Sequence, residues 1–142
     1  MYRDSHCHLD NKRYDDDRAD VFARAKAAGI ETLLAIGNGE GPGTDTLDCA
    51  VKLSQQYDWV YASVGIHPHE AALAKPEDFD ELQRLARDPK VIAWGEIGLD
   101  FPYDHSPRRV PPRVFLQPMA LAPPPNHWPY LQFTLLVPPP SV

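Results

Sequence analysis

The sequence predicts an α/β fold in which parallel strands alternate with helices over about the first hundred residues. Two observations carry this prediction. Short apolar segments of strand length alternate with longer segments whose apolar residues recur at helical spacing. The strand segments are apolar along most of their length, which is typical of strands covered on both faces. A β-α-β-α-β-α-β order of this kind produces a parallel sheet with helices packed outside it.

Four strands are expected, and right-handed crossovers place them in sequential order. Each strand but the last is followed by a helix, so the four units form half of a barrel. The glycine-rich segment after the second strand, residues 37–43, matches no phosphate-binding motif, and we expect it to be only a flexible loop. The expected strands are residues 2–7, 31–36, 60–65 and 91–95.

Three helices are expected between these strands. The first runs from Asp16 to Ala28 and stops at Gly29, a residue that commonly ends helices. Thr44 is expected to cap the second helix. Pro76 suits the first turn of the third. The buried faces are expected to consist of Val21, Phe22, Ala25 and Ala28 in the first helix, Leu47, Ala50 and Val51 in the second, and Phe79, Leu82, Leu85 and Ala86 in the third.

Composition restricts the class of protein. A chain of 142 residues that is 43% hydrophobic and 24% charged is expected to be a soluble globular protein of one domain or less. No apolar run reaches the roughly 18 residues needed to cross a bilayer, and the charged N-terminus lacks the apolar stretch of a signal peptide. We therefore expect a cytoplasmic protein without a membrane partner. Cys7 and Cys49 match no zinc motif and are expected to be reduced thiols, with Cys7 facing the core.

The net charge of -6 conceals an asymmetry. All 20 acidic residues lie at or before Asp104, while three arginines and no acid follow Ser106. The first part therefore offers no basic face for nucleic acid. A nucleic-acid substrate is still compatible with this charge, because bound cations can supply the missing positive charge.

Polar side chains gather at the carboxyl ends of the predicted strands, where parallel α/β proteins bind ligands. Residues i and i+2 of a strand point to the same side, so the first pair of histidines should converge. Two imidazoles and a carboxylate are a usual ligand set for a divalent metal. The residues concerned are His6 and His8 after the first strand, His67 and His69 after the third, and Glu96 and Asp100 at the end of the fourth.

Several of these residues also allow a purely structural role. His67 either contacts substrate or caps the loop beside its proline, and His69 is open to the same two interpretations. Asp4 and Asp100 either orient a ligand by hydrogen bonding or lie at the ends of the strands without a role in the site. The acidic run 15–17 is expected to be a solvated helix start and not a metal site.

Three segments resemble the TatD family of metal-dependent deoxyribonucleases in the amidohydrolase superfamily. They are "DSHCHLD" at residues 4–10, "VGIHPHE" at 64–70 and "GEIGLD" at 95–100, and the resemblance covers residues 1–104 and weakens to about residue 122. It implies a TIM-barrel-like (β/α)8 hydrolase, of which this chain would hold about four of the eight units.

The same resemblance implies a cofactor, a substrate and residue roles. The cofactor would be divalent metal ions (magnesium, manganese or zinc), two per site, with His6 and His8 binding one ion and Glu96 bridging both. His67 would face the phosphate of a DNA substrate cleaved in 3'-to-5' direction. Phosphodiester hydrolysis fits this set, because two metals about 3.5–4 Å apart activate water and neutralise the phosphoryl oxygens. No protein partner is implied.

The departure from the family begins after Asp104. Three prolines, at 111, 112 and 118, stand where the family's next helix would run, and 11 of the 16 prolines lie between 107 and 142. The family's two later histidines and its late aspartate, which would activate the water, have no counterpart, and His127 cannot be equated with either missing histidine. The catalytic residue therefore stays unknown.

Two hypotheses of different class follow. Residues 1–106 are expected to form the N-terminal half of a TatD-like domain, and residues 107–142 an aberrant, mostly irregular tail. The chain is then either a divalent-metal DNase or a truncated or frameshifted inactive fragment of one. Within the tail only residues 130–137 are rich enough in apolar and β-favouring residues to form a strand, which could add beside the fourth. An open half-barrel is expected to self-associate or to be poorly soluble.

Overall fold

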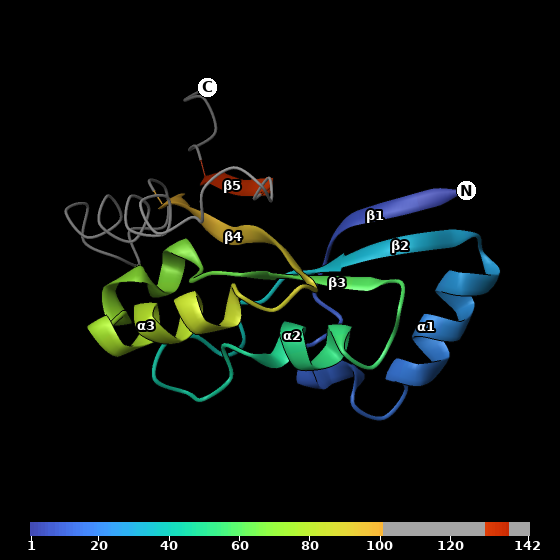
Figure 1. Ribbon diagram of the computed structural model, residues 1–142, viewed down its shortest axis with the longest axis horizontal. Coiled ribbons are helices and arrows are strands. Elements are labelled where there is room, and N and C mark those ends of the chain that lie inside the picture. The colour runs from blue at the N-terminus through green and yellow to red at the C-terminus, as the bar shows by residue number, and fades with distance from the viewer. Residues whose placement is uncertain (101–129, 137–142) are drawn as a thin grey trace, which may run out of the picture.

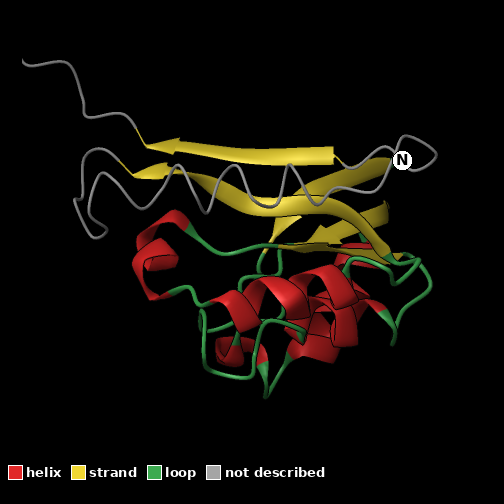
Figure 2. Cartoon of the chain, turned by 60° about the vertical axis from the view of Figure 1, so that its left-hand side comes forward, coloured by secondary structure: helices red, strands yellow, loops and turns green. Residues whose placement is uncertain are grey.

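The computed structural model describes residues 1–100 and 130–136. A curled parallel sheet forms one layer, and the helices cover a single face of it (Figures 1 and 2). In Figure 1 the outer strands β1 and β5 rise above the central strand β3, on the side away from the helices. None of the helices in the described part of the chain is both long and apolar enough to cross a membrane.

The sheet contains five parallel strands in the order β1-β2-β3-β4-β5. This order confirms the sequential arrangement expected from right-handed crossovers. The fourth strand is longer than expected, since it continues beyond residue 95 to Asp100. The strands are β1 (Tyr2–Cys7), β2 (Ile30–Ala35), β3 (Val60–Val64), β4 (Val91–Asp100) and β5 (Tyr130–Leu136).

The fifth strand confirms the one structured segment expected in the tail. It lies beside β4 with Tyr130 opposite Ala93, and the ladder runs on to the pair Leu136 and Asp100. The other expectations for the tail concern residues 101–129 and 137–142, which lie outside the described residues.

Within residues 1–100, three α-helices and two short 3-10 helices connect the strands. The α-helices are α1 (Arg18–Ala27), α2 (Cys49–Ser54) and α3 (Pro76–Leu85), and the 3-10 helices are η1 (Lys12–Tyr14) and η2 (Pro68–Leu73). Gly29 follows α1 with a φ of 89°, a left-handed conformation that glycine adopts without steric cost. Pro76 occupies the first turn of α3, as expected.

Two details of the helices differ from expectation. Thr44 does not cap α2, because that helix begins only at Cys49 and its N-cap is Asp48. The Thr44 hydroxyl instead donates a hydrogen bond of 2.6 Å to the Gly41 carbonyl within the preceding loop. Ala28 is exposed, because it follows the last turn of α1 and does not contribute to that helix's buried face.

The core lies between the sheet and the helices. Alternate residues of β2 point to opposite faces, so Leu33 packs toward the helices while Leu34 packs on the other face, and the two are only 1% and 5% exposed. Burial on both faces explains why the second half of β2 and most of β3 are apolar, whereas β1 is polar and largely exposed. The helix side of the core includes Phe22, Leu33, Ala35, Val51, Val60, Ala62, Val64, Phe79, Leu82 and Trp94.

The glycine-rich segment is not merely a flexible loop, so that expectation was wrong. Gly37 is buried, and a Cβ atom there would overlap the Ser63 carbonyl oxygen. Asn38 is 8% exposed, and the Gly43 amide donates a 3.1 Å hydrogen bond to Asp78 Oδ1 of α3. Glycine is needed here for close approach of the backbone, and the packing of the segment could not be seen without its neighbours.

Candidate metal centre

His6 and His8 lie at the carboxyl end of β1 and are presented on the same side of the strand. The residue between them, Cys7, points the opposite way, packs against the core and donates from Sγ to the Leu34 carbonyl at 3.4 Å. The Asp4 carboxylate accepts a 3.0 Å hydrogen bond from the His6 backbone amide, which fixes the strand before the pair. The alternation of a strand thus turns the sequence His-Cys-His into two convergent imidazoles and one core thiol.

Glu96 of β4 meets the two histidines across the two intervening strands, β2 and β3. Its side chain is 8% exposed, whereas those of His6 and His8 are 39% and 40% exposed. The Nε2 atoms of the two imidazoles are 3.1 Å apart, and they lie 3.9 Å and 3.8 Å from Glu96 Oε2. A carboxylate this deeply buried requires compensating charge, and a bound cation supplies it most directly.

These three distances define a site for one ion. A triangle with sides of 3.1, 3.8 and 3.9 Å has a circumscribed radius of about 2.1 Å, so the centre of that circle lies about 2.1 Å from each of the three donor atoms. Imidazole nitrogens and carboxylate oxygens bind zinc at about 2.0–2.2 Å. The donor types and their spacing therefore fit a divalent metal, and they are held in place by the carboxyl end of β1 and the middle of β4.

His67 approaches the other oxygen of the same carboxylate. Its Nε2 lies 3.8 Å from Glu96 Oε1, and its side chain is 24% exposed. The His69 backbone amide donates a 3.2 Å hydrogen bond to His67 Nδ1. A neutral imidazole that accepts at Nδ1 carries its proton on Nε2, so His67 presents an N–H donor toward the centre. An N–H donor suits a phosphate oxygen, whereas a metal requires the free lone pair of an imidazole nitrogen.

Two buried polar residues that the sequence did not single out support Glu96. Asn38, just after β2, accepts a 3.1 Å hydrogen bond from the Glu96 amide through its Oδ1 atom. Ser63 of β3 donates a 2.6 Å hydrogen bond to the Gly95 carbonyl and accepts a 3.2 Å bond from the Gly37 amide. The signal that could have identified Asn38 is its place at the carboxyl end of a strand, on the same edge of the sheet as the histidines.

The remaining candidates are placed as follows. His69 stacks edge-on against His67 with ring centroids 4.5 Å apart. Residues 15–17 are exposed at the start of α1, as expected, and Asp15 pairs with Arg18 at 2.6 Å. The side chain of Asp100 lies outside the described part of the structure, so its expected role stays a prediction.

Residues 3–126 match the family described as TatD related DNase. The chain belongs to this family. The match agrees with the three motifs, and the curled sheet of parallel strands with outer helices is the corresponding part of the family's TIM-barrel-like fold.

Relatives of known name share the same region. The chain is 36% identical over 122 residues to the Bacillus subtilis protein named uncharacterized metal-dependent hydrolase YabD, covering 86% of this chain and 46% of that protein. It is 33% identical over 114 residues to the Salmonella typhimurium 3'-5' ssDNA/RNA exonuclease TatD, covering 80% of this chain and 42% of the exonuclease.

A solved structure gives the same result. The crystal structure of YJJV, a TatD homologue from Escherichia coli K12, superposes with a TM-score of 0.71 at 27% identity, over 84% of this chain and 46% of that one. The chain therefore spans less than half the length of each of these relatives.

A small cavity adjoins the candidate metal centre of this TatD-family chain. Its volume is about 90 Å³, and His8, Asp10 and Asn38 contribute to its lining. Burial raises the pKa of the Asp10 carboxyl above its usual value, although a backbone hydrogen bond and the positive charge of Arg18 partly oppose this. At the cavity wall Lys12 Nζ lies 2.7 Å from Glu40 Oε1, which joins the loop after β1 to the glycine-rich segment.

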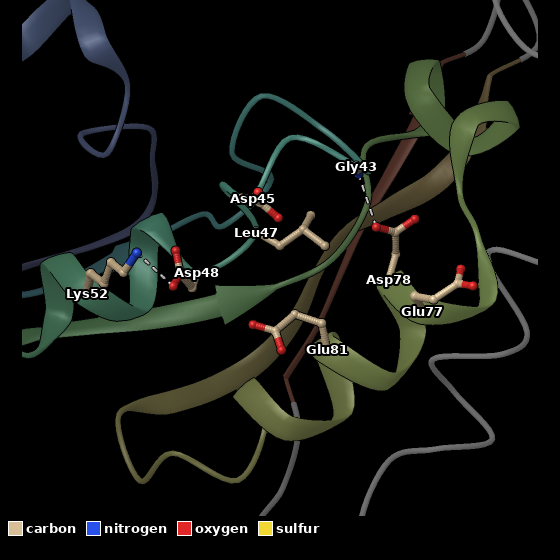
Figure 3. A pocket seen from close by; sticks show the side chains of 8 residues that line it. All are labelled: Gly43, Asp45, Leu47, Asp48, Lys52, Glu77, Asp78 and Glu81. Carbon is tan, nitrogen blue, oxygen red and sulfur yellow. Dashed lines mark hydrogen bonds and ion pairs between the residues drawn. The ribbon is translucent and has the colours of Figure 1, made fainter.

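A larger cavity, of about 470 Å³, lies between α2 and α3, away from the histidines (Figure 3). Five carboxylates and a single lysine line it, so its charge repels a phosphate backbone. Lys52 is already paired with Asp48 at 2.8 Å, and Asp78 accepts the Gly43 amide. The smaller site beside the histidines is chemically the better candidate for a phosphodiester. The charged lining residues are Asp45, Asp48, Lys52, Glu77, Asp78 and Glu81.

Proposed function

We propose that this chain provides half of the active site of a divalent-metal-dependent hydrolase of the TatD DNase type, which cleaves phosphodiester bonds of DNA in 3'-to-5' direction. One observation carries the proposal. A single point lies about 2.1 Å from His6 Nε2, His8 Nε2 and Glu96 Oε2, within the bonding range of a divalent metal.

The residues would divide the work as follows. His6, His8 and Glu96 Oε2 would hold one ion, and Glu96 Oε1, which lies on the side of His67, would bridge to a second. Magnesium, manganese and zinc are the candidates. Bound metal would supply an activated water and would neutralise charge on the phosphoryl oxygens.

His67 would bind substrate in this scheme. Its Nε2–H group points toward the centre because the His69 amide occupies Nδ1, so it can donate to a non-bridging phosphate oxygen without changing tautomer. The acidic balance of the chain supports the need for metal, since the first part offers no basic face for a polyanion. Several relatives are named as exonucleases of single-stranded DNA and RNA, which makes single-stranded nucleic acid the substrate to test, with the cytoplasm as the proposed location.

The alternative of an inactive fragment rests on the ligand count. The family's two later histidines and its water-activating aspartate have no counterpart in this sequence. A metal site with three protein ligands and no assigned base would bind the ion weakly and leave the water unactivated.

A cleavage assay tests both candidates. The purified chain is incubated with end-labelled single-stranded DNA and magnesium, manganese or zinc, beside His6→Ala, Glu96→Gln and the control Glu77→Gln. Glu77 is an exposed carboxylate of α3, remote from the histidines. Metal-dependent shortening from the 3' end that only the first two changes abolish supports the hydrolase. Absence of cleavage by the parent with all three metals supports the fragment.

A further inference from the structure

We infer that Asn38 and Ser63 are positioning residues for Glu96: together they hold the peptide group between Gly95 and Glu96, and so keep the Glu96 carboxylate in reach of His6 and His8. The inference rests on the proposed metal site and adds two residues that act through the carboxylate without contacting the ion.

The two side chains bind the two different polar groups of one peptide, its amide and its carbonyl. Asn38 Oδ1 accepts the Glu96 amide at 3.1 Å, and Ser63 Oγ donates to the Gly95 carbonyl at 2.6 Å. Ser63 Oγ also accepts the Gly37 amide at 3.2 Å, so β2, β3 and β4 are joined at this one hydroxyl. With both its donor and its acceptor engaged, the peptide cannot rotate without breaking at least one bond.

The sheet itself does not hold this peptide in a regular ladder. The last matched pair between β3 and β4 is Val64 with Trp94, and the register of β4 against β5 shifts between Trp94 and Ile97. Gly95 and Glu96 therefore lie where the ladder is interrupted. The two side chains supply hydrogen bonds at that gap.

Because these residues are buried, the loss of either hydrogen bond is costly. Asn38, Ser63 and Glu96 are 8%, 0% and 6% exposed, so water does not readily replace a lost partner. A metal site also tolerates little movement, because ligand distances must stay within about 0.2 Å of their ideal values. A shift of the peptide would therefore move the Glu96 carboxylate and change its distance to the ion.

Metal affinity is the readout that separates positioning from general stability. We would titrate Mn²⁺ into the metal-free full chain by calorimetry, using Asn38→Leu, Ser63→Ala and the conservative Asn38→Asp, which keeps the acceptor. Ser54→Ala is the matched control, because Ser54 is also 0% exposed and its hydroxyl also donates to a backbone carbonyl, at 2.7 Å in α2. Asn38→Leu and Ser63→Ala are expected to weaken Mn²⁺ binding about 10–100-fold, the range found when partners of metal ligands are removed.

The controls are expected to behave differently. Ser54→Ala should bind Mn²⁺ as the parent does, and Asn38→Asp should retain binding. The inference would be overturned, and the proposed function left standing, by either of two results in a parent that binds Mn²⁺. One is that Asn38→Leu and Ser63→Ala bind Mn²⁺ within twofold of the parent, and the other is that Ser54→Ala loses as much affinity as they do. A parent that binds no Mn²⁺ through His6 would overturn the proposed function and this inference with it.

Discussion

Substitution of Gly65 by alanine should disturb the metal centre directly. A Cβ atom at Gly65 would lie 2.7 Å from the Gly95 carbonyl carbon and 3.0 Å from the Glu96 amide nitrogen. Ordinary contact begins at 3.4 Å, so the Gly95–Glu96 peptide must move by about 0.7 Å. Such overpacking costs about 1–3 kcal/mol. Alanine also lowers the conformational entropy of the unfolded chain, which offsets about 0.4–1 kcal/mol of that cost. The displacement exceeds the roughly 0.2 Å tolerance of a metal site, and Mn²⁺ affinity should fall about tenfold or more.

Gly43→Ala provides the control for this change. Gly43 has a φ of 74° and open space around its would-be Cβ, so alanine there incurs backbone strain without a clash. That strain costs about 1–2 kcal/mol. Urea unfolding should therefore show comparable losses for both variants, whereas calorimetric titration with Mn²⁺ should show a loss only for Gly65→Ala. Unchanged Mn²⁺ affinity in Gly65→Ala would refute the argument that close packing of this peptide sets the position of Glu96.

Two further predictions concern the scaffold. Asp78 is buried and accepts hydrogen bonds from the backbone amides of Gly43 at 3.1 Å and Lys75 at 2.8 Å. Asp78→Ala should therefore lower the free energy of unfolding, measured in urea, by about 1–3 kcal/mol. An effect no larger than that of Asp80→Ala, a change at an exposed residue, would contradict this. Burial raises the pKa of Cys7 from 9.0 to about 12, so iodoacetamide at pH 8 should alkylate it about a thousandfold more slowly in metal-free folded protein than in urea. As the pH rises, the Cys7 thiol loses its proton at a lower pH in the unfolded chain than in the folded one, so the free energy of unfolding should fall between about pH 9 and 12. Equal alkylation rates in the folded and unfolded protein would contradict the burial of the thiol.

Much of the fold could be predicted from the sequence because it depends on local periodicity. The apolar strand segments and their sequential order follow from alternation with helices, and β5 (Tyr130–Leu136) was recognisable from its β-favouring composition alone. The Thr44 cap was wrong because a threonine hydroxyl in a loop has several backbone partners within reach, and here the Gly41 carbonyl is the one it binds.

The candidate site was predictable only in part, for a related reason. His6 and His8 are two residues apart on one strand, so their convergence follows from the strand's period. Glu96 was expected at the end of another strand on the same edge of the sheet, and it meets the histidines although β4 continues beyond it to Asp100. Asn38 and Ser63 were missed because their role depends on which backbone groups of β4 lack regular ladder partners. That information arises from the register between strands, which no single segment of the sequence contains.

Anomalous diffraction from crystals of the chain soaked in Mn²⁺ tests the central claim most directly. The predicted result is a peak about 2.1 Å from His6 Nε2, His8 Nε2 and Glu96 Oε2, the point that their mutual distances define. The contradicting result is a fully soaked crystal with no peak among these three atoms, or with manganese only in the acidic cavity between α2 and α3.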